Sequence, residues 1–308
     1  MKKPDQRLDP WILEEKVAQC YSTWGKSYYE DYYSPKASYP PVHVDMIRSR
    51  VRAAGVKSLL DAGCGPASFL RHLAGDGLDL YGFDLTTEMI EEAKNVMARH
   101  GFSRDHFWKG SVLHSVDFVR PGFRSDYDAA VCLGVFPHIP AEYDEVVLKN
   151  LQMVLSSGGL IFVEARNALF SLFTQNRYSY QFIREELIRA EDLVAASGVC
   201  GKAVVTALNE MQKYFRMDLP PVRKGKRGEP GYDEVLSRTH IPFVLQAQLR
   251  RNGFRDIQTL FYHYHALPPM FSDLGPDFFK TASLAMENPE DWRGHFMASA
   301  FVLVGRKE

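Results

Sequence analysis

The chain has 308 residues, of which 45% are hydrophobic and 24% charged, and its formal net charge at pH 7 is -1. A charge so close to zero excludes a general electrostatic attraction to nucleic acid or to an anionic membrane surface. No apolar run is long enough to cross a bilayer, no signal-peptide core follows the N-terminus, and the 4 cysteines form no Cys-x-x-Cys pair. We therefore expect a globular, cytoplasmic protein without structural zinc.

Residues 1–50 are expected to form a helical N-terminal extension that is rich in aromatic side chains. Its aromatic residues are Trp11, Tyr21, Trp24, Tyr28, Tyr29, Tyr32, Tyr33 and Tyr39. Such side chains either pack the extension onto the rest of the protein or place a hydroxyl group against a ligand. Pro40 and Pro41 then break the chain before a helix predicted over residues 44–54.

A strand predicted over residues 56–61 leads into a glycine turn. The strand ends in Asp61, the turn contains Gly63 and Gly65, and a helical pattern begins at Phe69. Glycine lets the backbone turn sharply and lets a ligand approach the main chain. We expect the free N–H groups of the helix to face that ligand. Strand, glycine turn and helix in this order predict the start of a nucleotide-binding βαβ unit.

A second strand, predicted over residues 79–84, ends in another acidic residue. Asp84 follows the glycine turn by about 20 residues, the spacing typical of a carboxylate that binds ribose hydroxyl groups. The alternative is an acid that stabilises the N-terminus of the next helix. That helix is predicted from the spacing of its apolar residues, which are Met89, Ile90, Ala93 and Met97.

The remaining elements of the core are predicted in two parts of the chain. Residues 51–166 form the first part and add strands near 105–109, 127–133 and 159–165. Residues 241–308 complete the core with a helix over 241–252 and strands over 257–265 and 298–305.

Residues 167–240 are an insertion that follows the fifth strand. Ligands of open α/β sheets bind at the carboxyl ends of the strands, so we expect this segment to act as a lid that encloses a small acceptor. It is predicted to be mostly helical, with a long helix over residues 180–196. The alternative role is extra scaffold or an oligomer surface. Its basic loop, residues 222–231, is interpreted as a solvated loop or, alternatively, as a loop that contacts phosphate.

Four segments of the chain resemble the motifs of a known family, in the same order. They are residues 59–67, 82–89, 126–140 and 155–164. Together they resemble the class I S-adenosylmethionine-dependent methyltransferases, in the branch that methylates quinols, sugars and other small molecules. The resemblance implies an α/β fold with a Rossmann-like seven-stranded sheet, helices on both faces and a mostly helical lid inserted after strand five. It also implies S-adenosylmethionine as the cofactor.

The resemblance assigns the cofactor to the ends of the first four strands. The residues are Asp61, Gly63, Cys64, Gly65, Asp84, Leu85, Met89, Gly110, Ser111, Val112 and Leu133, with Tyr28 and Tyr33 closing over the methionine end. Two positions depart from the family pattern. Ala67 stands where a third glycine is common, and Ser111 stands where an acid often meets the adenine amine. Serine still accepts a hydrogen bond; alternatively, the backbone of Ser111 and Val112 makes this contact.

Methyl transfer to a hydroxyl group requires in-line alignment, exclusion of water and a general base. The loop after the fourth strand faces the transferred methyl group in this family, so His138 is ranked first as the base, before His265 and His263. The alternatives are a pocket-shaping role for His138 and core positions for His263 and His265, which share one face of a strand. No third ligand accompanies this pair, so no metal site is expected. Glu164, Arg166 and His240 are assigned to binding the acceptor or the lid.

We therefore predict a methyltransferase that O-methylates a small molecule with a sugar, lipid-linked or phenolic hydroxyl group. An RNA or protein methyltransferase is an alternative, although no basic or aromatic groove is evident. A second alternative is a non-catalytic module that binds S-adenosylmethionine. A hydride-transferring Rossmann enzyme is a weaker rival, because its fingerprint requires a glycine where Ser68 stands. The sequence leaves the oligomeric state open.

Overall fold

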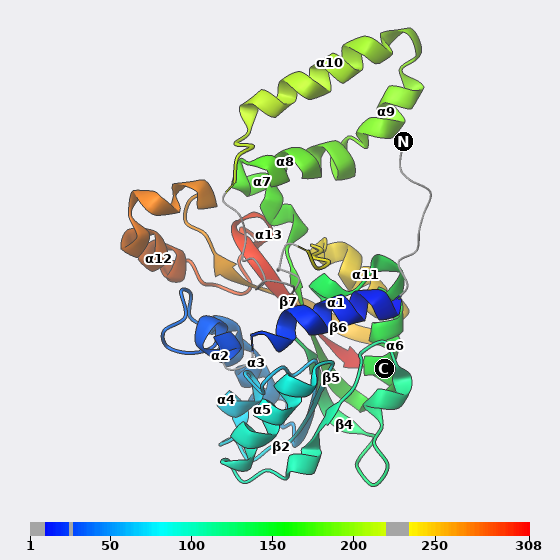
Figure 1. Ribbon diagram of the computed structural model, residues 1–308, viewed down its shortest axis with the longest axis vertical. Helices are drawn as coiled ribbons and strands as arrows, with labels where there is room; N and C mark the ends of the chain where they lie inside the picture. The colour runs from blue at the N-terminus through cyan, green and yellow to red at the C-terminus, as the bar shows by residue number, and fades with distance from the viewer. Residues whose placement is uncertain (1–9, 25–26, 220–233) are drawn as a thin grey trace. The chain divides into compact units, whose positions relative to one another are not determined.

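The structure is a computed structural model that describes residues 10–24, 27–219 and 234–308 (Figure 1). The basic loop 222–231 lies outside the described residues, so its role stays a prediction. The α-helices are α1 Pro10–Ser22, α2 Ser27–Tyr32, α3 Val42–Ala53, α4 Leu70–Leu73, α5 Thr87–Ala98, α6 Asp144–Met153, α7 Ser171–Thr174, α8 Arg177–Phe182, α9 Ala190–Ala196, α10 Gly201–Met211, α11 Pro242–Arg251, α12 Pro276–Ala285 and α13 Gly294–Met297. The strands are β1 Ser58–Ala62, β2 Asp79–Asp84, β3 Phe107–Lys109, β4 Tyr127–Cys132, β5 Leu155–Arg166, β6 Phe254–Tyr264 and β7 Ala298–Lys307.

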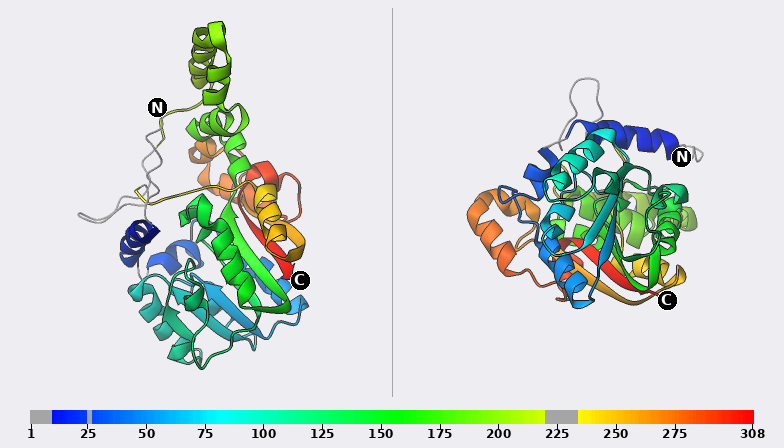
Figure 2. Two further views of the ribbon diagram at one scale, coloured as in Figure 1. Left: turned by 90° about the vertical axis from the view of Figure 1, so that its right-hand side faces the viewer. Right: turned by 90° about the horizontal axis from the view of Figure 1, so that it is seen from below.

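The strands form one seven-stranded sheet in the order β3-β2-β1-β4-β5-β7-β6. The pairs β1–β2, β2–β3, β1–β4 and β4–β5 are parallel. Helices lie on both sides of this parallel part, with α4 and α5 on one side and α6 on the other (Figure 2). Because helices cover both faces, every residue of β1 is buried, and its sequence is an apolar run rather than an alternation. The predicted Rossmann-like fold is confirmed.

The chain divides into two compact units. The first holds the described residues of 1–165, 222–260 and 302–308, and the second holds those of 166–221 and 261–301. The division differs from the ranges expected above, because residues 261–301 group with the insertion rather than with the core. Within the second unit, α9 and α10 pack side by side (Figure 1). A lid function for this unit stays a prediction, as does the alternative of a scaffold or oligomer surface.

One helix near the site is a single turn, and another is shorter than the sequence predicts. The helix after the glycine turn, α4, has only four residues, and it follows Ala67, whose φ of 56° is left-handed. The long helix expected over 180–196 is interrupted by a π-helical turn at Ile183–Leu187 and by Arg189, whose φ is 52°. A right-handed helix cannot continue through a left-handed residue. α4 is therefore too short to present several turns of aligned N–H groups to a ligand.

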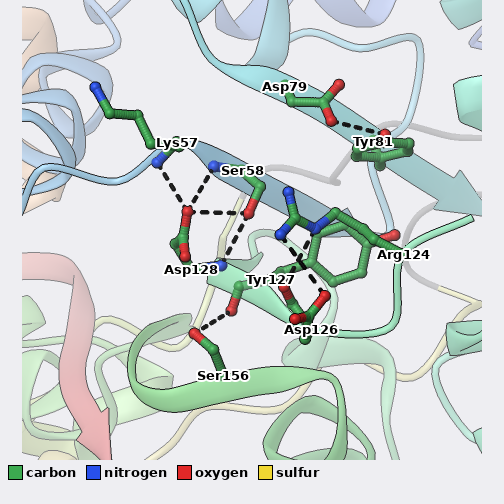
Figure 3. Close-up of polar contacts among 9 residues, drawn as sticks. All are labelled: Lys57, Ser58, Asp79, Tyr81, Arg124, Asp126, Tyr127, Asp128 and Ser156. Atoms are coloured by element: carbon green, nitrogen blue, oxygen red, sulfur yellow. Dashed lines mark hydrogen bonds and ion pairs between the residues drawn. The ribbon is translucent and has the colours of Figure 1, made fainter.

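Polar contacts join β1 to β4 at the amino ends of these strands (Figure 3). Oδ2 of Asp128 accepts hydrogen bonds from the main-chain N–H groups of Lys57 and Ser58, at 2.9 and 3.0 Å, and from the Ser58 hydroxyl at 3.1 Å. Burial alone would raise the pKa of Asp128, but these donors hold it below its ordinary value. Asp128 thus fixes the register of β1 against β4 at the edge opposite their carboxyl ends.

Among the described helices, none combines the length and the apolar character that crossing a membrane requires.

Candidate active site

A pocket of about 1000 Å³, open solvent at its mouth included, lies at the carboxyl ends of β1, β2 and β4 in the first unit. Every residue that the sequence analysis assigned to the cofactor lines this pocket, and so does His138. Helix α1 supplies a further part of the wall through Leu13, Glu14, Val17 and Tyr21. The roles of these residues stay predictions, but the structure brings the residues together in one pocket.

The glycine turn is held by the neighbouring strand. The main-chain N–H groups of Gly63 and Cys64 both donate to the carbonyl oxygen of Phe83, at 2.8 and 2.9 Å. Gly63 has a φ of 89°, and a Cβ atom there would clash with Cγ2 of Val135. Only glycine satisfies both conditions, since other residues are strained at this φ and carry a Cβ. The turn therefore leaves its main chain open to a ligand.

Asp84 is tied to the same turn. Its Oδ2 accepts a hydrogen bond from the N–H of Gly65 at 2.9 Å, and its Oδ1 accepts from the N–H and the hydroxyl of Thr86 at 2.9 and 3.0 Å. Burial raises the pKa of Asp84, and these hydrogen bonds oppose that effect. A carboxylate offers about four acceptor positions, so Asp84 can both order the turn and accept a hydrogen bond from a ribose hydroxyl group.

Asp61 has an acceptor that the described residues do not satisfy. It is 2% exposed, and among the described residues its Oδ1 has no hydrogen-bond partner. Burial, and then the charge of Asp84, raise the pKa of Asp61 well above its ordinary range. An unpaired buried carboxylate oxygen is costly, and a cationic donor in the pocket would relieve that cost.

The charge of the lining favours a cation over a phosphate. Glu14, Asp61 and Asp84 contribute carboxylates, and the described residues that line the pocket include no lysine or arginine. A pyrophosphate requires cations or a helix N-terminus, and α4 is a single turn. The amino group and sulfonium of S-adenosylmethionine are positive, so the pocket suits that molecule better than a dinucleotide.

Ser111 is more fully engaged than the sequence suggests. Its hydroxyl donates to Oε1 of Glu14 and accepts from the N–H of Leu113 at 3.0 Å. Its own N–H donates to Oδ2 of Asp117 at 2.9 Å. The main-chain N–H of Ser111 is therefore committed to the protein, whereas the carboxylate of Glu14 lies beside the hydroxyl and on the pocket wall.

The two tyrosines expected at the methionine end both line the pocket. Burial raises the pKa of Tyr28 well above its ordinary value, with neighbouring Tyr33 and Glu164 adding to the effect. Burial and then Glu164 do the same for the pKa of Tyr33. Both phenols are neutral at pH 7 and can donate hydrogen bonds to a ligand carboxylate.

His138 is fixed in one tautomer by its neighbours. Its Nδ1 lies 2.7 Å from the main-chain oxygen of Leu236, and its Nε2 lies 2.8 Å from the Tyr21 hydroxyl. A carbonyl oxygen only accepts, so Nδ1 carries the proton of the neutral ring and Nε2 carries the lone pair. The basic nitrogen is therefore held on the Tyr21 side, and Tyr21 and His138 both line the pocket.

The loop that carries His138 is anchored to residues 234–240, the last part of the insertion. The N–H of Arg238 donates to the carbonyl oxygen of Pro137 at 2.8 Å, and its guanidinium donates to the carbonyl oxygen of Ile139. The same guanidinium donates to both oxygens of Asp144. Nε2 of His240 lies 3.7 Å from that carboxylate, beyond hydrogen-bonding distance.

The other predicted site residues do not line the pocket. Oε2 of Glu164 accepts from the N–H of Gly134, a lining residue, at 2.5 Å. Arg166 belongs to the second unit. His263 and His265 also lie there, with ring centroids 5.2 Å apart, and burial lowers their pKa values to about 4 and about 3. The described residues contain no cluster of three groups that could hold a metal ion.

Sequence reasoning did not single out Glu14, Tyr21 and Arg238 as site residues. On α1, Glu14, Val17 and Tyr21 recur at helical spacing, which was the available signal that one face of the extension meets a ligand. Nothing in the sequence points to Arg238, because its partners lie about 100 residues earlier and share no motif with it.

Comparisons with known proteins agree with this geometry. Residues 60–161 match the model of the methyltransferase domain family. The chain is 23% identical over 159 residues to the ubiquinone biosynthesis O-methyltransferase of Actinobacillus pleuropneumoniae serotype 5b (strain L20), over 50% of this chain and 63% of that protein. It is 27% identical over 157 residues to the enzyme of the same name from Burkholderia multivorans (strain ATCC 17616 / 249), over 49% and 61%. The chain thus spans less than two thirds of the length of these curated relatives.

A solved structure shows the same fold. Magnesium protoporphyrin IX methyltransferase from Synechocystis PCC 6803, with bound SAH, matches with a TM-score of 0.52 at 16% identity and covers 97% of this chain and 100% of its own. The glycine turn, the two strand-end carboxylates and the family match all fall in one segment of the chain. Residues 60–161 are therefore similar to a methyltransferase domain, and the chain has the fold of that solved methyltransferase.

Proposed function

We propose that this protein transfers a methyl group from S-adenosylmethionine to a hydroxyl group of a small molecule. The observation that carries the proposal is a pocket whose carboxylates suit a cation and whose wall contains His138, with Nε2 as its basic nitrogen. When bound, S-adenosylmethionine supplies a methyl group activated on a sulfonium. The named relatives are O-methyltransferases, which supports a hydroxyl acceptor.

The residues of the chain would share the work as follows. Oδ1 of Asp61 would receive the ammonium group and so gain the partner that it lacks. Asp84 would accept from the ribose hydroxyl groups, and the neutral Tyr28 and Tyr33 would donate to the carboxylate. His138 would take the proton of the acceptor, a role worth about 10² to 10⁴ in rate. The buried walls would exclude water and hold the reacting groups in line.

Calorimetric titration with S-adenosylmethionine, S-adenosylhomocysteine and NAD tests the cofactor. We expect micromolar binding of the first two and none of NAD, and we expect Asp84→Ala to lower the affinity several-fold or more. Binding of NAD alone would overturn the proposal. Transfer of a labelled methyl group to sugar, phenol and catechol probes then tests the reaction. Cofactor binding without transfer to any hydroxyl probe would favour the alternative of a non-catalytic module.

A further inference from the structure

The hydroxyl of Tyr21 and the basic nitrogen of His138 form a hydrogen bond, and both residues line the pocket. Its oxygen lies 2.8 Å from Nε2 of His138, and because the other ring nitrogen donates to Leu236, the phenol donates its hydrogen to Nε2. Tyr21 is half-buried, lines the pocket and comes from α1. The one lone pair of Nε2 is thus engaged by the Tyr21 hydroxyl, so the proton of an acceptor reaches Nε2 either through this hydroxyl or by displacing it.

The ring of Tyr21 is held by its aromatic neighbours. Its centroid lies 5.6 Å from that of Trp24, 6.0 Å from that of Tyr28 and 5.4 Å from that of His138, the last two edge-on. Such pairs favour defined orientations, and the phenol is thereby kept on His138. A phenol oxygen that donates one hydrogen bond retains two acceptor positions. It can therefore accept a hydrogen bond from the acceptor while it donates to the imidazole.

We propose that Tyr21 is a catalytic residue that passes the proton of the acceptor hydroxyl group to His138. The inference rests on the proposed function. As the acceptor oxygen forms its bond to the methyl carbon and the carbon–sulfur bond breaks, the acceptor proton moves to the oxygen of Tyr21. The phenolic proton moves at the same time to Nε2 of His138. The imidazolium then releases one proton to solvent, which restores both residues.

A double-mutant cycle tests this relay, with catechol as the acceptor probe. Two residues that act in one relay are non-additive, so removing either removes the same step. We expect Tyr21→Phe to lower kcat by about 10²-fold, and we expect Tyr21→Phe combined with His138→Ala to be no slower than His138→Ala alone. Affinity for S-adenosylmethionine should stay within about twofold. Tyr32→Phe is the matched control, because it removes a phenol of the same aromatic cluster that does not line the pocket.

Three results would overturn the relay. A Tyr21→Phe enzyme with near-normal kcat would show that His138 accepts the proton directly. Losses that multiply in the double variant would show independent roles. A strictly linear dependence of the wild-type rate on the deuterium fraction of the solvent would show that one proton moves rather than two, and this measurement needs no variant to fold. The two proposals fail differently: a wild-type protein that methylates no hydroxyl probe overturns the proposed function, and the relay with it.

Discussion

Arg238 donates to both carboxylate oxygens of Asp144 at 2.9 Å, and Asp144 is 2% exposed. The pair anchors the segment that presents the Leu236 carbonyl oxygen to the loop that carries His138. The tautomer of the proposed base thus depends on a contact outside the pocket. Arg238 is a positioning residue in this arrangement, since it acts through Leu236 and the loop.

Arg238→Ala should lower kcat by about tenfold or more and leave the affinity for S-adenosylmethionine nearly unchanged. Removing one partner of a buried ion pair also costs about 3 kcal/mol of stability. Arg251→Ala is the control, because its pair with Glu145 is half-exposed on both sides and such pairs contribute little. Steady-state kinetics and urea unfolding measure both effects. Equal losses in the two variants would show that Arg238 has no specific role.

Binding of S-adenosylmethionine should release protons where the pH lies below the raised pKa of Asp61 in the free protein. The pKa of Asp61 is raised by burial and by Asp84, and a cationic ligand against Oδ1 would lower that pKa again. Affinity should therefore fall as the pH falls through the raised pKa, where the free protein binds a proton at Asp61. Calorimetry in two buffers with different ionisation enthalpies measures the release, and Asp61→Asn should remove most of it. Identical apparent enthalpies in the two buffers would contradict this prediction.

Gly63→Ala should lower both stability and cofactor affinity, the latter by tenfold or more, because the added methyl group meets Val135 on the loop that leads to His138. Overpacking of this kind costs about 1 to 3 kcal/mol. Gly55→Ala is the matched control: its φ of 68° is also left-handed, but a Cβ there meets nothing within 4 Å. Thermal melting and calorimetry distinguish steric conflict from backbone strain. If the two variants behave alike, the close approach of Val135 is unimportant.

The stability of the protein should decrease as the pH falls from about 6.5 to about 4. Burial lowers the pKa of His263 to about 4 and that of His265 to about 3, from an ordinary 6.5. In that interval the unfolded chain binds protons that the folded chain does not, so acid favours unfolding. Urea unfolding across this range measures the slope, and His265→Leu should make it shallower. His100→Asn, at an exposed position, should leave the slope unchanged.

The sequence predicted the first half of the sheet well, because its signals are local. β1 and β2 are mostly apolar and carry Asp61 and Asp84 at or near their carboxyl ends. The glycine turn follows β1, and a helix with a clear apolar spacing follows β2. The left-handed conformation of Ala67 could not be predicted, since alanine ordinarily favours helices. Local propensity gives no sign of such a conformation.

The proposed base was found from its position in a motif, but its surroundings were not. The contacts of His138 with Tyr21 and Leu236 join residues 117 and 98 positions apart. They arise only when the N-terminal extension and residues 234–240 fold against the loop between β4 and α6. No periodicity or spacing within a short stretch of sequence encodes such a contact.

Helix α1 and residues 234–240 both lie outside the segment 60–161 that matches the methyltransferase domain family. They nevertheless supply both hydrogen-bond partners described for the ring of His138. The matched segment carries the glycine turn, and the flanking segments determine which ring nitrogen of His138 carries the hydrogen. If α1 and residues 234–240 were exchanged for those of another protein with a similar core, the hydrogen bonds to the ring of His138 would change. The glycine turn and the cofactor pocket residues of 60–161 would stay the same.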